Sequence, residues 1–357
     1  MSKKKCIYFL YQKDFSEKGK DRYFVYEDGL FSEVDSDYII NLEADLVTHD
    51  YWLIGSSLYK KHKRLPNSVI DINLLSRIVA GVKAVSGDTQ SWDIPHRIKP
   101  LYRDQDDFNR YMSMYYRREE LSKDAYMLFA HKLEEYKEQL FGLAEKAGEL
   151  YRFFDIELPL FNLFSNIAAK GLRISEDVLK KHKLTIKYDY YKGLKEFAEK
   201  HDVLYEQPSD GDVKDKLRLL GYDVDNYGID FLIDFLPSTS GFTEDLRRLQ
   251  KLGKSYRVFN SISSGAKRLN PIVETHATST SRIYFKSPNI QNISKRYRDI
   301  FIPDDGLQLS YIDYDQFEVG IMAALSADEK MNDIYTNMDA YLDLSTKVFG
   351  SGEFRKK

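Results

Sequence analysis

Cysteine is nearly absent from this sequence: Cys6 is the only one among 357 residues. A lone thiol excludes a disulfide framework and a cysteine-based zinc site, and it suits a reducing compartment. Apolar runs of about 18 residues are also absent, so no segment is expected to span a membrane. The basic start, Met1 to Lys5, precedes a short strand-like run and not a secretory apolar core. We therefore expect a cytoplasmic protein.

Internal repeats and low-complexity stretches are absent as well. Apolar residues make up 43% of the chain, close to the roughly 45–50% of ordinary globular proteins. Disorder over the whole chain is therefore excluded, and a sizeable core is expected. The length of 357 residues indicates about two domains.

The net charge is only −3, but the charges are distributed unevenly. Between Arg247 and Arg298 the only acid is Glu274. The basic residues of this stretch are Arg247, Arg248, Lys251, Lys254, Arg257, Lys267, Arg268, Arg282, Lys286, Lys295, Arg296 and Arg298. Such a stretch is either a solvated face or a surface that follows the phosphates of a polyanion. Its amides can contact sugars and base edges; they are Asn289, Gln291 and Asn292.

Acidic residues dominate after Arg298. They are Asp299, Asp304, Asp305, Asp313, Asp315, Glu318, Asp328, Glu329, Asp333, Asp339 and Asp343. Carboxylates that follow a basic stretch are typical of a site where Mg²⁺ meets phosphate.

The first half of the chain mixes strand and helix patterns. Apolar runs predict strands at Cys6 to Tyr11 and Tyr23 to Tyr26. Asp71 to Ala80 is predicted as a helix, and residues 83–107 as a loop. A long helix with one apolar stripe is expected from about residue 115.

The second half is predicted to be mostly helical. Gly171 is typical of a helix end and Ser175 of the next helix start, and residues 176–260 follow as charged helices. Alternation then predicts a strand over Leu307 to Asp313, and a helix is predicted over Phe317 to Ala327. Asp313 would stand at the end of this strand, where it is either a helix cap or a metal ligand.

Several stretches resemble family A DNA polymerases, the bacterial polymerase I type. Asp313 to Glu318, followed by Ile321 to Ser326, resembles the first palm motif, D-Y-S-Q-I-E-L-R with A-H-L-S. Thr278 to Arg282 and Ser287 to Ile293 are similar to T-x-T-G-R-L-S-S and P-N-L-Q-N-I-P. Three further stretches occur in family order, namely Asp155 to Leu160 with Lys170 to Leu172, Pro237 to Ser240, and Lys251 to Tyr256. The match covers roughly residues 150–350.

The resemblance implies two-metal phosphoryl transfer with Mg²⁺. Asp313 would be the catalytic residue and would bind both ions, with the carbonyl of Tyr314 as a further ligand. The implied nucleotide-binding residues are Gln316, Glu318, Arg296 and Tyr341; Glu318 would exclude a 2′-hydroxyl. The implied DNA-binding residues are Arg247, Lys251, Lys254, Arg282, Asn289, Gln291 and Asn292. The implied partners are primer–template DNA and dNTPs.

Some positions depart from the family pattern. Gly320 replaces an arginine, Asp315 a serine and Ser281 a glycine, and Tyr341 stands where the family has a histidine. The sequence ends at Lys357, before the basic fingers helix and the second carboxylate motif of the family. We therefore expect this chain alone not to polymerise. It would be half of a split polymerase, an intron- or intein-interrupted product, or a truncated form. A second polypeptide would supply the rest.

Residues 1–150 take the place of the family's 3′–5′ exonuclease domain. No D-x-E occurs between Cys6 and Asp14, and Ile54 stands where H-N-x-x-F-D has its aspartate. Only Asp124 is similar to one of the four metal ligands, so proofreading should be inactive.

The expected fold class is α/β (α+β). It comprises a degenerate RNase H-like exonuclease domain at 1–150, the start of the palm with a helical thumb at 151–260, and the first part of the palm at 261–357. The competing interpretation is a non-catalytic DNA-binding or regulatory remnant of a polymerase. Carboxylates beside DNA favour the enzyme, whereas Gly320 and Tyr341 favour the remnant. A phage or other mobile genome would fit as the source, with the host cytoplasm as the location.

Overall fold

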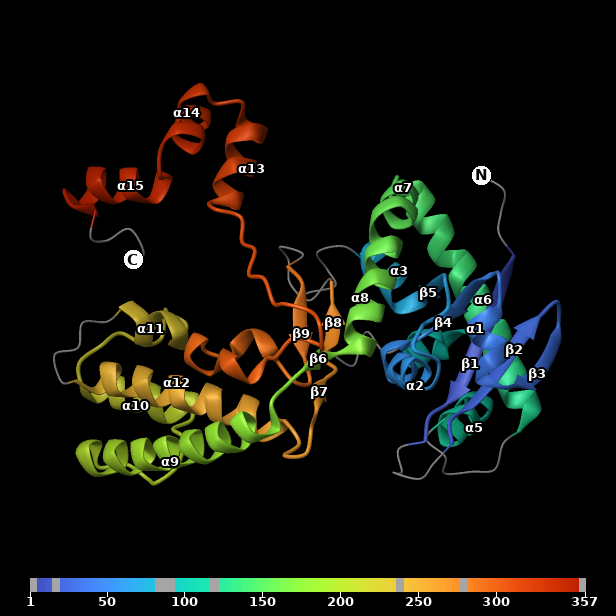
Figure 1. Ribbon diagram of the computed structural model, residues 1–357, viewed down its shortest axis with the longest axis horizontal. Helices are drawn as coiled ribbons and strands as arrows, with labels where there is room; N and C mark the ends of the chain where they lie inside the picture. The colour runs from blue at the N-terminus through green and yellow to red at the C-terminus, as the bar shows by residue number, and fades with distance from the viewer. Residues whose placement is uncertain are drawn as a thin grey trace. The chain divides into compact units, whose positions relative to one another are not determined.

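The structure is a computed structural model, and it describes residues 5–14, 20–80, 94–115, 122–235, 241–275 and 282–352. The chain forms two compact units, Met1–Ile302 and Pro303–Lys357, whose elements are drawn in Figure 1. Each unit is described by itself below. Among the described residues, none of the helices combines the length and the apolarity needed to cross a bilayer.

A mixed five-stranded sheet lies at the start of the first unit (Figure 1). Its strand order is β3-β2-β1-β4-β5; β1 pairs antiparallel with β2 and parallel with β4. The strands are β1 (Cys6–Gln12), β2 (Arg22–Glu27), β3 (Leu30–Val34), β4 (Asp45–Thr48) and β5 (Val69–Asp71). Both strands predicted from apolar runs are thereby confirmed. Because β1 is central and almost wholly buried, its apolar residues run on without alternation.

The helices of residues 36–146 pack around this sheet, and α5 and α6 contact β1. They are α1 (Ser36–Asn41), α2 (Trp52–His62), α3 (Ile72–Ala80), α4 (Ile94–Ile98), α5 (Gln105–Tyr115) and α6 (Lys123–Lys146), with a 3₁₀ turn η3 (Lys99–Leu101). The predicted helix over Asp71 to Ala80 is confirmed. The prediction of a loop over 83–107 was wrong for residues 94–101 and 105–107, and residues 81–93 lie outside the described ranges. Phe108, Tyr111 and Met114 are buried, and this packing stabilises α5 despite its polar sequence.

The segment that connects the sheet region to the following helices ends at Gly171. The short helix α7 (Leu150–Arg152), the π-helical turn η4 (Phe153–Glu157) and α8 (Leu158–Lys170) precede it. Gly171 has φ 71°, and a Cβ there would lie 2.7 Å from the Leu269 carbonyl oxygen. Only glycine suits this close approach, which lets β6 (Leu172–Arg173) pair with β7 (Arg268–Leu269). The predicted helix end is confirmed.

Residues 176–261 form a group of helices, as the sequence predicts. Ser175 caps the first by accepting a hydrogen bond from the Val178 amide. The group consists of α9 (Glu176–His201), α10 (Asp210–Leu219), α11 (Ile229–Phe235) and α12 (Phe242–Ser261). Helices α9 and α12 lie side by side (Figure 1). Gly193 permits this contact, because a Cβ there would lie 2.8 Å from a methyl carbon of Leu252.

The first unit closes with a hairpin and two 3₁₀ turns. Strands β8 (Ile272–Glu274) and β9 (Tyr284–Lys286) pair antiparallel, and η5 (Ile290–Asn292) and η6 (Lys295–Ile300) follow. Ile293, Tyr297 and Ile300 are buried and pack in one cluster with residues of α9 and α12. This packing places the C-terminal part of the basic stretch against the helix group.

The second unit contains α13 (Phe317–Ser326), α14 (Glu329–Asn337) and α15 (Ala340–Phe349). The helix predicted over Phe317 to Ala327 is confirmed. The strand predicted over Leu307 to Asp313 was wrong, because these residues are irregular. A strand needs a neighbour for its backbone groups, and none of the described strands pairs with this segment. Apolar side chains stay exposed on this unit, among them Ile312 at 86% and Leu325 at 83%.

Candidate functional site

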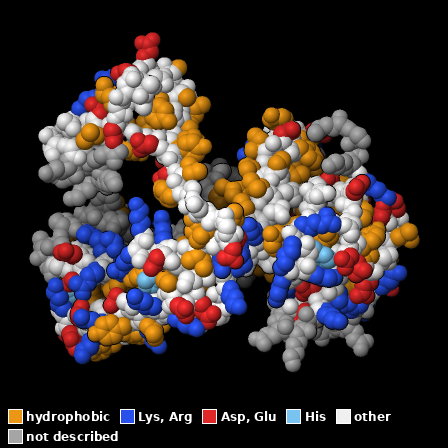
Figure 2. Space-filling view, viewed as in Figure 1, with side chains coloured by type: hydrophobic (Ala, Val, Ile, Leu, Met, Phe, Trp, Pro, Cys, Tyr) orange, Lys and Arg blue, Asp and Glu red, His pale blue; other side chains and the backbone are white. Residues whose placement is uncertain are grey.

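The basic face of α12 carries three of the predicted DNA-binding residues. Arg247, Lys251 and Lys254 follow i, i+4, i+7 spacing, which places them on one side of the helix. Lys251 and Lys254 are exposed. Arg247 is half-buried, and its Nε donates to the carbonyl of Ile233 in α11. Figure 2 shows lysine and arginine side chains gathered over this helical region. Two lysines can therefore meet phosphates, while Arg247 also joins two helices.

The one acid of the basic stretch, Glu274, is compensated by two basic side chains. It forms an ion pair with Lys286 across the β8–β9 hairpin, and the Arg77 guanidinium lies 3.7 Å from its carboxylate. Glu274 therefore leaves the surface potential of the basic stretch positive. Arg77 comes from α3, so this pair also connects the N-terminal region with the hairpin.

The three amides of the basic stretch differ in what they contact. The Gln291 amide accepts from the Phe285 N–H at 3.1 Å and donates to the Ile283 carbonyl at 2.9 Å. Asn289 caps η5 by accepting from the Asn292 N–H at 3.3 Å. Through these hydrogen bonds the two side chains hold the backbone of β9 and of the segment that follows it. The Asn292 side chain is exposed and is the most available of the three to a ligand.

The two remaining predicted arginines are both exposed. The Arg296 guanidinium lies 4.5 Å from the centre of the Tyr297 ring. This cation–π contact orients the side chain, because Tyr297 is buried against α9 and α12. Arg282 directly follows residues 276–281. Most of the motif Thr278 to Arg282, including the departure Ser281, thus lies outside the described residues.

The predicted metal ligands belong to the second unit. Asp313 is exposed, and one carboxylate oxygen accepts from the Tyr311 hydroxyl at 3.1 Å. The Tyr314 side chain is exposed, with its ring 5.2 Å from that of Phe317. Asp315 and Glu318 are exposed as well. The structure therefore presents these acids to solvent at the start of α13.

Gln316 and Tyr341, both predicted near the nucleotide, lie close together. The Gln316 Oε1 accepts a hydrogen bond of 2.7 Å from the N–H of Ala340, the residue before Tyr341. The Tyr341 side chain is 43% exposed. Helix α14 lies between these two residues in the sequence and carries Tyr335. A Cβ at Gly320 would lie 2.4 Å from a ring carbon of Tyr335. The glycine that departs from the family pattern thus makes room for an aromatic ring.

Oxygen donors suited to Mg²⁺ occur at Asp313 and at the carbonyl of Tyr314, since hard cations prefer carboxylate and carbonyl oxygens. Both donor oxygens are therefore of the chemical type that Mg²⁺ prefers. A cluster of three or more His, Cys, Asp or Glu side chains does not occur in the part of the chain that the structure describes.

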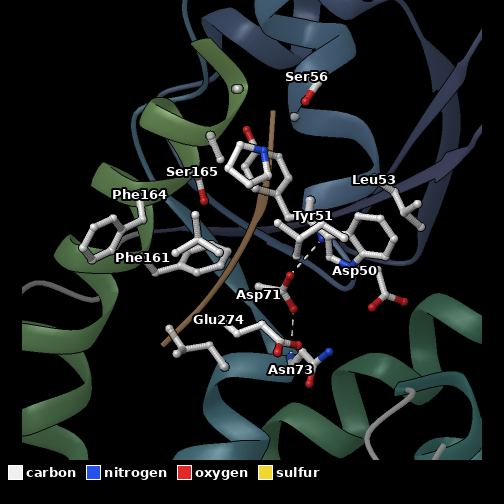
Figure 3. A pocket seen from close by; sticks show the side chains of 18 of the residues that line it. Asp50, Tyr51, Leu53, Ser56, Asp71, Asn73, Phe161, Phe164, Ser165 and Glu274 are labelled. Atoms are coloured by element: carbon white, nitrogen blue, oxygen red, sulfur yellow. Dashed lines mark hydrogen bonds between the residues drawn. The ribbon is translucent and has the colours of Figure 1, made fainter. Parts of the chain in front are cut away.

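A pocket of about 720 Å³ opens in the first unit, between α2, α3 and α8 and the hairpin strand β8 (Figure 3). Aromatic walls include Phe161 and Phe164 of α8. Asp50, Asp71 and Glu274 are its acids. The acid Glu274 is already paired, as described above, and its two basic partners Arg77 and Lys286 also line the pocket.

Asp71 is a structural acid. One oxygen accepts from the Tyr51 N–H and the other from the Asn73 N–H, each at 2.8 Å (dashed lines in Figure 3). Burial, reinforced by the charge of Asp50, raises the pKa of the Asp71 carboxyl to about 6. Because both oxygens hold backbone amides at the starts of α2 and α3, Asp71 fixes these helices. The sequence predicted a helix from Asp71 onward but did not indicate this role.

The positions that match the exonuclease motifs are poor in acids. Ile54 is fully buried in α2. Asp124 is exposed in the first turn of α6, and it is not among the residues that line the pocket. His49 is buried, with its Nδ1 3.1 Å from Asp50 and its Nε2 3.3 Å from the Tyr111 hydroxyl. Sequence reasoning missed this cluster, because the aromatic residue comes from the unpredicted helix α5.

Comparison with known proteins points to one family. Residues 237–355 match the family model of DNA polymerase family A. DNA polymerase I of Caldicellulosiruptor bescii is 30% identical over 115 residues, which are 30% of this chain and 14% of that protein. The thermostable DNA polymerase I of Thermus filiformis is 24% identical over 233 residues, or 58% of this chain and 27% of that protein.

A solved structure matches the whole fold. The POL domain of Pol1 from M. smegmatis, in complex with DNA primer-template and dNTP, superposes with a TM-score of 0.66 at 15% identity. The match covers 97% of this chain and 63% of that one, so this protein shares the mixed α/β fold of that structure. The chain spans 14% and 27% of the two curated relatives above.

Proposed function

This chain is a relative of the family A DNA polymerases, and we propose that it forms part of a template-directed DNA polymerase that adds dNTPs to a primer 3′ end. One observation carries the proposal. The matched segment, residues 237–355, contains both the basic face of α12 and the exposed acids beside α13. A polyanion-binding surface and a carboxylate for Mg²⁺ are the two parts that phosphoryl transfer on DNA requires.

The proposed domains follow from this assignment. Residues 151–260 are the start of the palm with a helical thumb, and residues 261–357 are the first part of the palm. Residues 1–150 are an exonuclease-like domain of RNase H-like fold. The mixed sheet at the start of the chain supports an α/β domain there, and the 97% coverage by the polymerase structure supports a polymerase-like fold.

Each part has a chemical task in the proposal. Asp313 and the Tyr314 carbonyl hold Mg²⁺, which stabilises negative charge on the transferred phosphoryl group when bound. Arg296 and Tyr341 face the triphosphate, and Gln316 and Glu318 lie beside the nucleotide, with Glu318 excluding a 2′-hydroxyl. Lys251, Lys254, Arg247, Arg282, Asn289, Gln291 and Asn292 form the DNA-contacting surface, in which the amides and Arg282 face the minor groove.

The complete active site needs the fingers and rear palm, which we propose come from further polypeptide. One exposed carboxylate at Asp313 does not suffice to hold two metal ions. The proposed exonuclease domain is inactive, because Ile54 is buried where a carboxylate is needed and both oxygens of Asp71 are engaged by backbone amides.

The decisive experiment is primer extension by the chain joined to a polypeptide that carries the fingers and rear palm. Asp313→Ala should lower the extension rate by orders of magnitude while DNA binding stays near normal, since metal-held charge acts on the transition state. Glu329→Ala, a similarly exposed acid on α14, is the matched control and should leave the rate unchanged. Glu318→Ala should instead relax discrimination against ribonucleotides.

Two outcomes would overturn the proposal. Full extension activity in the Asp313→Ala assembly would remove the catalytic role of this acid. Salt-dependent DNA binding without extension in any assembly would favour a non-catalytic DNA-binding protein.

A further inference from the structure

The start of α15 is attached to the segment that precedes α13. Gln316 is the N-terminal boundary residue of α13, and its backbone lies in the left-handed region, at φ 52° and ψ 33°. From there its half-buried side chain reaches 24 residues along the chain, and Oε1 accepts the 2.7 Å hydrogen bond from Ala340 N–H. Its Nε2 lies 3.4 Å from a carboxylate oxygen of Asp315. Both ends of the Gln316 amide therefore already have partners within the chain.

This contact completes the N-terminal cap of α15. The first amides of a helix have no partner inside the helix. Asp339 accepts from the N–H groups of Tyr341 and Leu342 at 3.1 and 3.0 Å, and Gln316 accepts from Ala340. The peptide groups on both sides of the Tyr341 α-carbon are therefore held by Asp339, and Gln316, a residue at the start of another helix, holds the preceding peptide group, between Asp339 and Ala340.

A second contact fixes the intervening helix. The Gly320 N–H donates to the Gln316 carbonyl at 3.1 Å, and one turn into α13 the Tyr335 ring lies over Gly320. Because Tyr335 belongs to α14, a shift of α14 along α13 would move this ring from Gly320 towards the larger residues that flank it. With Gly320 holding α14 and Gln316 holding α15, the position of Tyr341 is set from α13.

We propose that Gln316 is a positioning residue: it acts on the nucleotide through Tyr341, by anchoring α15, and not by touching the nucleotide itself. This inference rests on the proposed function for its consequence, but the anchor can be tested in the chain alone. The alternative is direct contact of the Gln316 amide with the triphosphate through the second Nε2 hydrogen, since Oε1 and one Nε2 hydrogen are already engaged.

The experiment compares Gln316→Ala with Gln316→Glu, both made in an Asp315→Asn background. Glutamate keeps an acceptor for the Ala340 N–H, whereas alanine removes it. The background change removes the carboxylate that would otherwise repel the new one. Hydrogen exchange is measured on peptides spanning 338–346 of the chain. We expect roughly tenfold faster exchange of the first-turn amides in the alanine variant, and rates near the background in the glutamate variant.

Steady-state kinetics in the extending assembly supply the second measurement. The alanine variant should raise the dNTP KM about tenfold with little change in kcat, and the glutamate variant should restore it. Adding Tyr341→Ala to the alanine variant should cause little further loss, because the two residues act as one unit. Direct contact predicts the opposite order, since a carboxylate would repel the triphosphate more than alanine does.

Unchanged hydrogen exchange in Gln316→Ala would show that Gln316 does not anchor α15. A dNTP KM that is higher in Gln316→Glu than in Gln316→Ala would show that Gln316 does not act through Tyr341. If the unmodified assembly does not extend primers, the proposed function fails while the exchange result still decides the anchor.

Discussion

The sheet region at residues 5–80 and the unit Pro303–Lys357 place their acidic and apolar side chains in opposite ways. In the sheet region Asp71 is buried and bound by two backbone amides, and Ile54 is fully buried. In the second unit Asp313, Asp315 and Glu318 face solvent, and hydrophobic side chains lie on the surface of α13 (Figure 2).

This difference shows which positions remain available for chemistry. A carboxylate whose oxygens are both satisfied in the core has become part of the fold, so changing it alters stability first. An exposed carboxylate contributes little to stability and remains able to bind a cation. The first region thus uses Asp71 as part of its fold, whereas the second unit exposes its acids together with apolar surface.

The strongest test places the same charge in both regions. Ile54→Asp should lower the free energy of unfolding by roughly 3–5 kcal/mol, because an unpaired carboxylate is forced into the core. Leu325→Asp, at an 83% exposed position, should change it by less than about 0.5 kcal/mol. Urea unfolding followed by circular dichroism and tryptophan fluorescence measures both; Trp52 and Trp92, the only tryptophans, report on the N-terminal region.

Nuclease activity is a second measurement on the parent chain and on Ile54→Asp. We expect no degradation of a 3′ single strand by the parent chain or by Ile54→Asp, with Mg²⁺ present. Degradation that Asp124→Ala abolishes would contradict the assignment of a fold without nuclease function.

A pH titration tests the buried acid. Burial raises the pKa of Asp71 from its ordinary value of 3.8 to about 6 in the folded protein, so between these pH values the folded state keeps a proton that the unfolded state has lost. The stabilisation is full below about pH 3 and disappears as pH rises through 6. Asp71→Asn cannot titrate. The stability of the parent relative to this variant should therefore fall by about 3 kcal/mol between pH 3 and 7.5. A constant difference across this range would show that Asp71 is not a buried titrating group.

DNA binding measurements test whether the basic face of α12, and not positive charge elsewhere on the surface, contacts DNA. Reversing Lys251 and Lys254 to Glu should weaken binding to primer–template at least about tenfold, and should flatten the slope of log affinity against log salt by about 2. Every DNA sequence should be affected alike. The matched control reverses Lys123 and Lys146, two exposed lysines of α6, and should have little effect. Equal losses in both double variants would show that binding follows net charge and not this face.

The smallest expected effect concerns the packing of the second unit. Gly320→Ala should destabilise the contact between α13 and α14 by about 1–2 kcal/mol, because its Cβ would meet the Tyr335 ring. Hydrogen exchange over 317–337 measures this, and Tyr335→Ala should relieve it. Gly142→Ala in α6 meets no atom within 4 Å and should stabilise its helix slightly. Similar effects of the two alanines would rule out a steric role for Gly320.

Several elements could be predicted from sequence because local patterns determine them. The apolar runs of β1 and β2 and the Ser175 cap are patterns within a few residues. Gly171 also marks a helix end locally, although its close approach to Leu269 is a long-range contact. The family resemblance was readable for the same reason, since its motifs are short runs in a fixed order. Helix α5 could not be predicted, because its polar sequence is stabilised by burial of one face against the sheet region.

The sequence by itself determined which residue types are present for the proposed chemistry, and the order of the motifs along the chain. Only the tertiary structure decided which of them are engaged. Gln291 and Gln316 have the same side chain, yet one folds the segment after β9 and the other anchors α15. Leu307 to Asp313 has the alternation of a strand and is irregular. The reason is physical: hydrogen-bond partners, neighbouring strands and buried faces are supplied by residues far away in sequence, and a local pattern does not specify them.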